Sequence, residues 1–344
     1  MEPIIEEEKK KRILCLQGDR SACWFNRLMQ PFDFIGRNHK EYAIEIDGGI
    51  RPEYLQEVRD FVLWQRQYSP DVLECFFLMK KKNPNVKMVY EVDDALLYGK
   101  GVNVGPAHWN PAFVTYKKRG VQENIRIFLG AVDACFVATE PLKELYENFC
   151  KKVYVLPNSL DFSVFGPGPN NSKKRVVSWI GSNTHENDIK LIRPTIVRLA
   201  KDEDVFIKLF SADMKVKNTY TVPFVTIGDY YKMLSQLDGL ISLAPLAAVP
   251  FNKYKSNLRW LESSWQGMAV IASDFGPYQC IEHEKTGILV NHPNEWYDWI
   301  RYLLENEDVR LKIVANAQAE IREKYNIEKN YLLWKSAIDE ILEG

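Results

Sequence analysis

Lys255 and Glu262 place a cation and a carboxylate two helical turns apart in the stretch 251–267. Arg259 falls on the same side of the predicted helix, whose other side is apolar through Tyr254, Leu258, Leu261 and Trp265. Where such a helix begins beside a strand's carboxyl end, its amides and Lys255 can face phosphate oxygens, and Glu262 can accept hydrogen bonds from both hydroxyls of a ribose. This pattern suits a nucleotide diphosphate. The alternative interpretation is a solvated helix surface.

A short buried strand and a tight turn follow the predicted helix. Gly267 ends the helix, Ala269–Ala272 is the predicted strand, and Gly276, Pro277 and Tyr278 form what we name the GPY turn. The whole pattern, FN-x-x-KS-x-x-x-x-LE-x-x-x-x-G followed by VIAS-x-x-GPY and G-x-LV, resembles the donor-binding signature of the GT-B glycosyltransferases, in the retaining family 4 (glycosyl transferases group 1).

The resemblance implies a role for each part of this signature. Glu262 would bind the ribose, Lys255 would act in catalysis by stabilising the departing diphosphate, and the GPY turn would contact the distal phosphate or the sugar. The segment that includes Ile227 resembles the one whose backbone contacts the nucleotide base, which leaves the base unidentified. One departure stands out: relatives carry an acid eight residues before Glu262, and this chain has Tyr254 there.

A second segment of the family pattern is RVVSWIGSNTHEND, in which a predicted strand runs into a small polar loop. The form W-x-GS-x-TH resembles the GT-B donor loop, which implies donor contacts from Gly181, Ser182, Asn183 and His185. Many relatives carry Arg and Lys in this loop. Because Ser182 and Asn183 replace them here, phosphate contact would fall to backbone amides and to Lys255. His185 is either a donor contact or a surface residue at the start of a helix.

Two adjacent carboxylates, Asp93 and Asp94, end a predicted strand in the first half of the chain. They can bind an acceptor or act as a catalytic base, hold a divalent metal, or cap the next turn. A metal is disfavoured because a metal-dependent glycosyltransferase fold would bring its nucleotide signature close to these acids, whereas the signature lies far along the chain.

The segment from Phe76 to Arg126 is basic in a chain whose net charge is −1. It holds nine Lys and Arg residues against four acidic ones, and its densest cluster is Lys117, Lys118 and Arg119. If these side chains form one patch, they would bind a polyanionic acceptor: a phosphate-linked lipid or cell-wall polymer, or, as a second choice, DNA with a modified base. The alternative is that they are scattered, solvated helix ends.

Composition and missing motifs exclude several other classes of protein. The chain has 344 residues, enough for two domains, and no run long and apolar enough to span a membrane. The six cysteines show no C-x-x-C pair, so they indicate reduced thiols and a cytoplasmic location, with peripheral membrane contact still possible. Motifs for dinucleotide binding, P-loops, zinc proteases and α/β-hydrolases are absent.

Apolar strands alternate with helices twice along the chain, which predicts two α/β domains with doubly wound, Rossmann-like parallel sheets. The predicted strands are 13–17, 42–46, 61–65, 86–91, 133–138 and 153–156, then 175–180, 205–210, 224–227, 239–243, 269–272 and 288–290. A Gly-, Pro- and Asn-rich linker between them sets the domains at 1–165 for the acceptor and 166–326 for the donor. The GT-B resemblance implies two domains that face a cleft, with the terminal helix, 327–344, crossing back to the first domain.

The function expected from this resemblance is transfer of a sugar, as a hexosyltransferase, from a UDP- or GDP-sugar to an acceptor, with retention and with neither metal nor other cofactor. The alternatives are a sugar-nucleotide epimerase or phosphorylase of the same fold, and a catalytically silent scaffold that binds a glycan.

Overall fold

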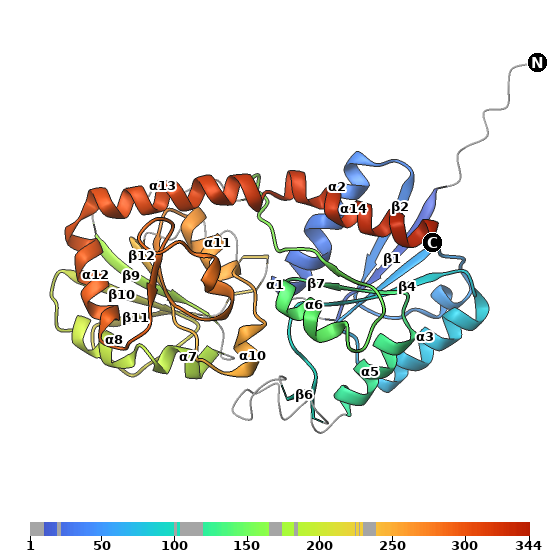
Figure 1. The fold of residues 1–344 in the computed structure, drawn as a ribbon, viewed down its shortest axis with the longest axis horizontal. Coiled ribbons are helices and arrows are strands. Elements are labelled where there is room, and N and C mark those ends of the chain that lie inside the picture. Colours follow the sequence, from blue (N-terminus) through green and yellow to red (C-terminus); the bar gives the residue numbers. More distant parts are fainter. Residues whose placement is uncertain are drawn as a thin grey trace, which may run out of the picture. The chain divides into compact units, whose positions relative to one another are not determined.

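The computed structural model describes residues 10–18, 22–99, 102–103, 120–164, 174–181, 185–223, 225–226, 228–229 and 239–344. The described residues divide into two compact units (Figure 1). The first unit takes those within Met1–Asp93, Tyr116–Pro157 and Ile327–Gly344. The second takes those within Asp94–Thr115 and Asn158–Asn326.

The first unit is built on a six-stranded sheet in the order β2-β1-β3-β4-β7-β8. Its strands are β1 (Lys11–Leu16), β2 (Tyr42–Asp47), β3 (Phe61–Gln65), β4 (Lys87–Val92), β7 (Ala134–Val137) and β8 (Val153–Val155). All neighbouring pairs are parallel. Because helices cover both faces of such a sheet, central strands such as FVLWQ are buried along their whole length, as the apolar runs predicted.

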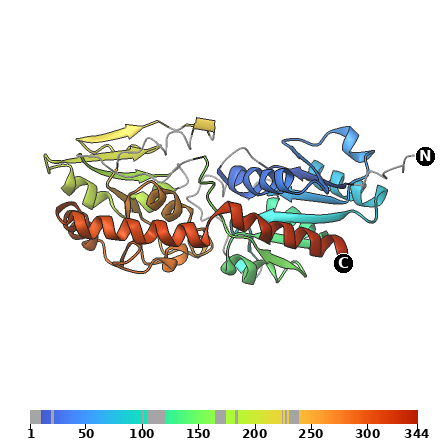
Figure 2. The same ribbon diagram turned by 90° about the horizontal axis from the view of Figure 1, so that it is seen from above.

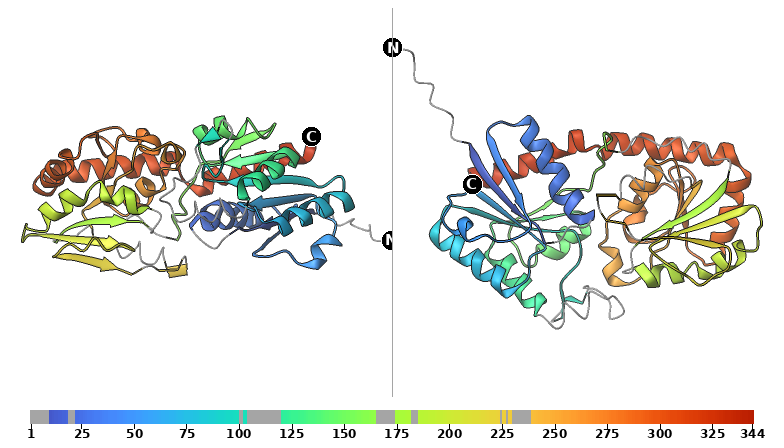
Figure 3. Two further views of the ribbon diagram at one scale, coloured as in Figure 1. Left: turned by 90° about the horizontal axis from the view of Figure 1, so that it is seen from below. Right: turned by 180° about the vertical axis from the view of Figure 1, so that it is seen from behind.

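Helices of the first unit include a segment from the far end of the chain. They are α1 (Ala22–Trp24), the π-helical turn η1 (Phe25–Met29), α2 (Gln30–Asn38), the 3-10 turn η2 (Pro52–Leu55), α3 (Pro70–Lys82), α5 (Val121–Ala131), α6 (Glu140–Tyr146) and α14 (Ile327–Glu343). Helix α14 packs on α2, as Figure 3 shows from behind. Its Trp334 is buried against Phe32 and Phe136, at ring-centroid distances of 6.0 and 5.7 Å. The terminal helix therefore completes the core of the first unit.

A fully buried ion pair lies in the same core. The Arg27 Nε atom donates to Glu91 Oε1 at 2.6 Å, and both side chains have no exposed surface. Arg27 also donates to the carbonyl of Leu156 and lies 4.7 Å from the ring centroid of Trp334. Burial raises the pKa of Glu91 to about 7, and Arg27 opposes that rise. A single arginine thus links η1, β4 and α14.

The second unit contains another six-stranded, parallel sheet, in the order β11-β10-β9-β12-β13-β14. Its strands are β9 (Arg175–Ile180), β10 (Val205–Phe210), β11 (Thr219–Val222), β12 (Ile241–Ala244), β13 (Ala269–Ser273) and β14 (Ile288–Val290). This is the Rossmann order 3-2-1-4-5-6, in which the direction of strand addition reverses between β9 and β12. Both sheets confirm the predicted fold class, α/β with two doubly wound domains.

Helices cover the second sheet, and α13 is seen lying along this unit in Figure 2. The helices are α7 (Glu186–Lys190), α8 (Arg193–Leu199), α10 (Pro250–Lys253), α11 (Leu258–Trp265), the 3-10 turn η4 (Gly276–Cys280), α12 (Glu295–Glu305) and α13 (Glu307–Lys324). A small antiparallel pair, β5 (Tyr98–Gly99) with β6 (Val102–Asn103), stands apart from both sheets.

Two predicted elements of the second unit are wrong in position. Of the strand expected at 224–227, only Val225 and Thr226 are among the described residues, and they are not in a strand; the edge strand of the sheet is Thr219–Val222, whose Tyr220 is 66% exposed. The helix expected from Tyr254 begins at Leu258, because the chain leaves α10 and turns at Lys255 and Ser256 before α11 starts. Lys255 and Glu262 therefore do not share one helical face.

All six cysteines lie among the described residues and none forms a disulfide; Cys15 and Cys135 are buried in the first sheet. Within the described part of the chain, no helix is long and apolar enough to cross a membrane.

We expect Arg27→Met to lower the free energy of unfolding by about 3–5 kcal/mol, because it leaves the Glu91 carboxylate buried without its cation. Urea unfolding followed by tryptophan fluorescence measures this. The loss should be larger at pH 8 than at pH 6. Folded Glu91 has the raised pKa, so lower pH lets the carboxyl take up a proton and escape the penalty.

The matched control is Arg37→Met, which breaks the exposed pair with Asp33 and should cost about 0–1 kcal/mol. The double variant Arg27→Met/Glu91→Leu should recover most of the stability. Equal losses in Arg27→Met and Arg37→Met would contradict the role given to the buried pair.

Candidate functional site

The candidate site is built from three loops that leave neighbouring strands of the second sheet. Strands β9, β12 and β13 lie side by side and are parallel, so their carboxyl ends meet at one edge. His185 follows β9, Lys255 follows β12, and the GPY turn follows β13. The direction of strand addition reverses between β9 and β12, and ligands of open α/β sheets bind at such a switch point.

Glu262 lies in α11, which is buried on all sides from Trp260 to Trp265. The Trp265 ring stacks on Phe162 at a centroid distance of 3.9 Å, and the Trp260 indole donates to the carbonyl of Thr286. Only 1% of Glu262 is exposed, so the interpretation of a solvated helix surface is wrong. Its Oε2 atom lies 3.9 Å from Nη1 of Arg259. A carboxylate in this setting requires polar partners.

Lys255 is held in a defined turn between α10 and α11. The next residue, Ser256, accepts a hydrogen bond from the Asn158 amide at 3.0 Å. The Lys255 Nζ atom lies 4.9 Å from the ring centroid of Phe251 and 3.9 Å from Oδ1 of Asp94, which also belongs to the second unit. The ammonium group is thus directed by an aromatic face and by a carboxylate, and its side chain is 19% exposed.

His185 precedes α7 and lies against the buried carboxylate of Asp188. Its Nδ1 atom is 2.8 Å from Asp188 Oδ2. Burial and the nearby charge of Lys255 lower the pKa of His185, while Asp188 opposes that fall, so the ring is neutral at neutral pH. The structure therefore brings His185 and Lys255 within electrostatic reach of each other, although they are 70 residues apart.

The GPY turn is packed directly on α10. Gly276 has a φ of 58°, and a Cβ atom there would lie 3.0 Å from the carbonyl oxygen of Asn252. Both facts require glycine at this position. Pro277 follows in the first turn of η4, and Tyr278 is buried, which raises the pKa of its phenol well above the usual range. The charges of Arg259, Asp188 and Glu262 all act on Tyr278.

The loop after β9 begins with a glycine that the core requires. A Cβ on Gly181 would lie 2.3 Å from the ring of Trp179, so only glycine lets the chain turn over that ring. Several other predicted site residues lie outside the described residues: Ser182, Asn183, Ile227, Lys117, Lys118 and Arg119.

The adjacent acids Asp93 and Asp94 have different partners. The Oδ1 atom of Asp93 accepts from Nη1 of Arg66 at 2.8 Å, within the first unit, whereas Asp94 faces Lys255 in the second. Each carboxylate thus faces a side-chain cation. The described residues contain no group of three or more His, Cys, Asp and Glu side chains arranged to hold a metal.

Sequence reasoning missed Asp188 and Asn252. Asp188 accepts hydrogen bonds from the backbone N–H of Ala247 and from the Asn252 amide, at 2.8 and 2.9 Å. An acid three residues after His185 was visible in the sequence. Its partners in the loop after β12 were not, because that contact depends on the strand order.

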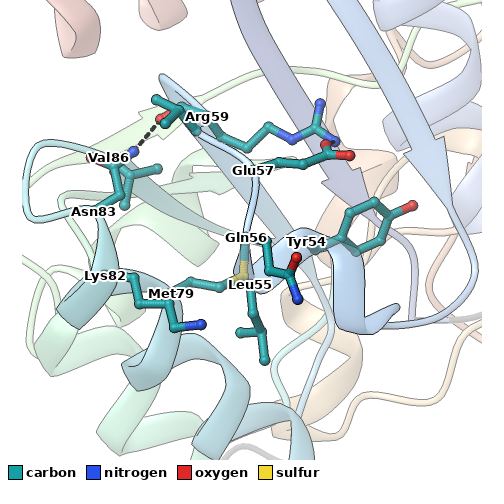
Figure 4. A pocket seen from close by; sticks show the side chains of 10 residues that line it. Tyr54, Leu55, Gln56, Glu57, Arg59, Met79, Lys82, Asn83 and Val86 are labelled. Atoms are coloured by element: carbon teal, nitrogen blue, oxygen red, sulfur yellow. Dashed lines mark hydrogen bonds and ion pairs between the residues drawn. The ribbon is translucent and has the colours of Figure 1, made fainter.

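A surface pocket lies elsewhere, beside the amino ends of β3 and β4 (Figure 4). Tyr54, Arg59, Met79, Lys82 and Asn83 contribute to its lining. Because ligands of open α/β sheets bind at the carboxyl ends of strands, this pocket is not the candidate site.

Comparison with solved structures gives the fold a name. The chain is similar to HepE of Anabaena, solved in complex with UDP and glucose, at 13% identity and a TM-score of 0.65, covering 96% of this chain and 100% of HepE. Sucrose-phosphate synthase of Thermosynechococcus elongatus is 12% identical with a TM-score of 0.67, and the match covers 97% of this chain and 100% of that protein. For TarM the identity is 16%, the TM-score is 0.58 and the match covers 83% of this chain, which spans 55% of TarM's length. These structures have the GT-B fold, and so does this chain.

The sequence matches no protein-family model and no curated protein.

Proposed function

We propose that this protein is a glycosyltransferase that moves a hexose from a UDP- or GDP-sugar, bound in the second unit, to an acceptor bound by the first. The support for this proposal is the convergence of His185, Lys255 and the GPY turn at one switch point of a GT-B fold, with Glu262 in the helix that follows Lys255. A neighbour of the same fold, HepE, was solved with UDP-glucose.

The chemistry follows from the charges in the site. Breaking the bond between the sugar and the diphosphate leaves negative charge on the departing nucleotide. Lys255, already directed by Phe251 and Asp94, is the cation we assign to that charge. The Glu262 carboxylate would accept from the ribose hydroxyls, while the GPY turn would contact the distal phosphate or the sugar.

We further propose that the reaction retains the anomeric configuration and needs no metal. Fixed protein cations and dipoles can neutralise the diphosphate, and Asp93 and Asp94 are each directed to a cation of the protein. Six described cysteines that form no disulfide fit a reducing compartment such as the cytoplasm.

For the acceptor, we propose a polyanion: a phosphate-linked lipid or cell-wall polymer, with DNA as the second choice. The support is the basic segment from Phe76 to Arg126. Its described part includes the exposed Lys81 and Lys82 at the end of α3.

We expect Glu262→Gln to weaken UDP or GDP binding about tenfold or more, because a hydrogen bond to a charged group contributes about 1.5–3 kcal/mol. Glutamine keeps the volume of the buried side chain, so thermal unfolding should change little. Isothermal titration calorimetry measures the affinity. The matched control is Glu305→Gln on α12, which should bind like the parent. Unchanged binding in Glu262→Gln would remove Glu262 from the site.

We expect transfer to survive treatment with EDTA. Release of the nucleotide diphosphate from the sugar donor, followed with a coupled assay, should proceed at an unchanged rate in the presence of the chelator. If EDTA abolishes release and manganese restores it, Asp93 and Asp94 become candidate metal ligands and the metal-free proposal fails.

We expect binding of a glycerol-phosphate polymer to weaken steeply with added salt, because neutralising contacts release counterions. UDP binding should change far less. The triple variant Lys117→Gln/Lys118→Gln/Arg119→Gln should reproduce at low salt the weak binding that the parent shows at high salt. The control is Lys215→Gln, an exposed lysine of the second unit. An affinity that is flat across salt would indicate a neutral acceptor.

A further inference from the structure

Asp188 is a buried carboxylate whose two oxygens serve different loops. Its Oδ1 accepts from the backbone N–H of Ala247 at 2.8 Å and from Nδ2 of Asn252 at 2.9 Å, both in the segment that follows β12. Its Oδ2 faces Nδ1 of His185, which follows β9, at 2.8 Å. Only 5% of Asp188 is exposed. The carboxylate therefore joins the two loops that leave the strands on either side of the switch point.

The contact with Asp188 fixes which ring nitrogen of His185 carries the proton. A carboxylate can only accept, so Nδ1 must donate to it. The other charged groups that act on the ring are Lys255 and Arg259, both cations that disfavour a second proton. A neutral ring with a proton on Nδ1 presents a lone pair on Nε2.

The chemistry of that lone pair distinguishes the parts of a nucleotide sugar. Ionised diphosphate oxygens carry no protons, so they cannot donate to Nε2, whereas a hydroxyl can. The ribose hydroxyls are assigned to Glu262, which leaves the hydroxyls of the transferred sugar. We propose that Asp188 is a positioning residue, which holds His185 so that Nε2 accepts a hydrogen bond from a hydroxyl of the sugar being transferred. This inference rests on the proposed function, and in it His185 recognises the transferred sugar rather than the phosphates.

The test separates the two oxygens of Asp188. Asp188→Asn is isosteric, and its amide oxygen can still accept from Ala247 and Asn252. Its NH2 group must then face Nδ1 of His185, which moves the ring proton to Nε2 and removes the acceptor. Long-range ¹H–¹⁵N spectra of the His185 ring should show the Nδ1–H tautomer in the parent and the Nε2–H tautomer in the variant. A parent ring with its proton on Nε2 would overturn the proposal without any ligand.

Affinities supply the functional readout. UDP, GDP, UDP-glucose and GDP-mannose are titrated into each protein, and the quantity of interest is how much more tightly the sugar nucleotide binds than its bare diphosphate. Asp188→Asn should reduce that preference for the sugar nucleotide about tenfold, which is the contribution of one hydrogen bond. In a His185→Ala background, Asp188→Asn should have no further effect.

Asn252→Ala is the control, because it removes a hydrogen bond to the other oxygen of Asp188, Oδ1, and keeps the contact between Oδ2 and His185. It should change diphosphate and sugar-nucleotide affinity together. If Asp188→Asn weakens both ligands equally, or keeps its effect in the His185→Ala background, Asp188 acts only on the fold and this inference fails. If the parent binds none of the four ligands, the proposed function fails first.

Discussion

The structure of the candidate site depends on one buried carboxylate, Asp188, placed where the second sheet reverses its direction of strand addition. Loops at such a point diverge to opposite sides, which opens a crevice but leaves no backbone ladder to hold them. Asp188 supplies the missing connection through its hydrogen bonds to Ala247, Asn252 and His185. The connection extends further, because the Asn252 carbonyl lies against Gly276 of the GPY turn. Three loops are thus held in register by one acid and one glycine.

The charged side chains of the candidate site lie close together and are largely buried, instead of forming ion pairs in solvent. The charges of Lys255 and Arg259 both act on His185 and keep its ring neutral, while Glu262 is buried in α11. A carboxylate buried at this depth is stable only with polar partners, and a cation held by an aromatic ring and a distant acid can exchange that acid for a stronger anion. A cation held in this way suits a ligand that carries phosphate oxygens.

The sequence predicted the core of this fold well and its contacts between distant segments poorly. Strands 175–180 and 269–272 were located from their apolar runs, because a strand buried on both faces leaves a continuous apolar pattern. The edge strand at 219–222 was misplaced, since exposure of Tyr220 removes that pattern. The helix start at Leu258 was missed, and the residue before Asn257 contacts a distant segment: Ser256 accepts from Asn158, 98 residues away. Asp188 was missed because its partners lie 59 and 64 residues along the chain.

A crystal structure of the protein with UDP bound tests the central claim most directly. The account predicts both ribose hydroxyls within hydrogen-bond distance of the Glu262 carboxylate, the diphosphate beside Lys255 Nζ, and His185 Nδ1 still on Asp188. UDP bound away from the switch point of the second sheet, for example in the pocket beside Tyr54 and Arg59, would contradict it.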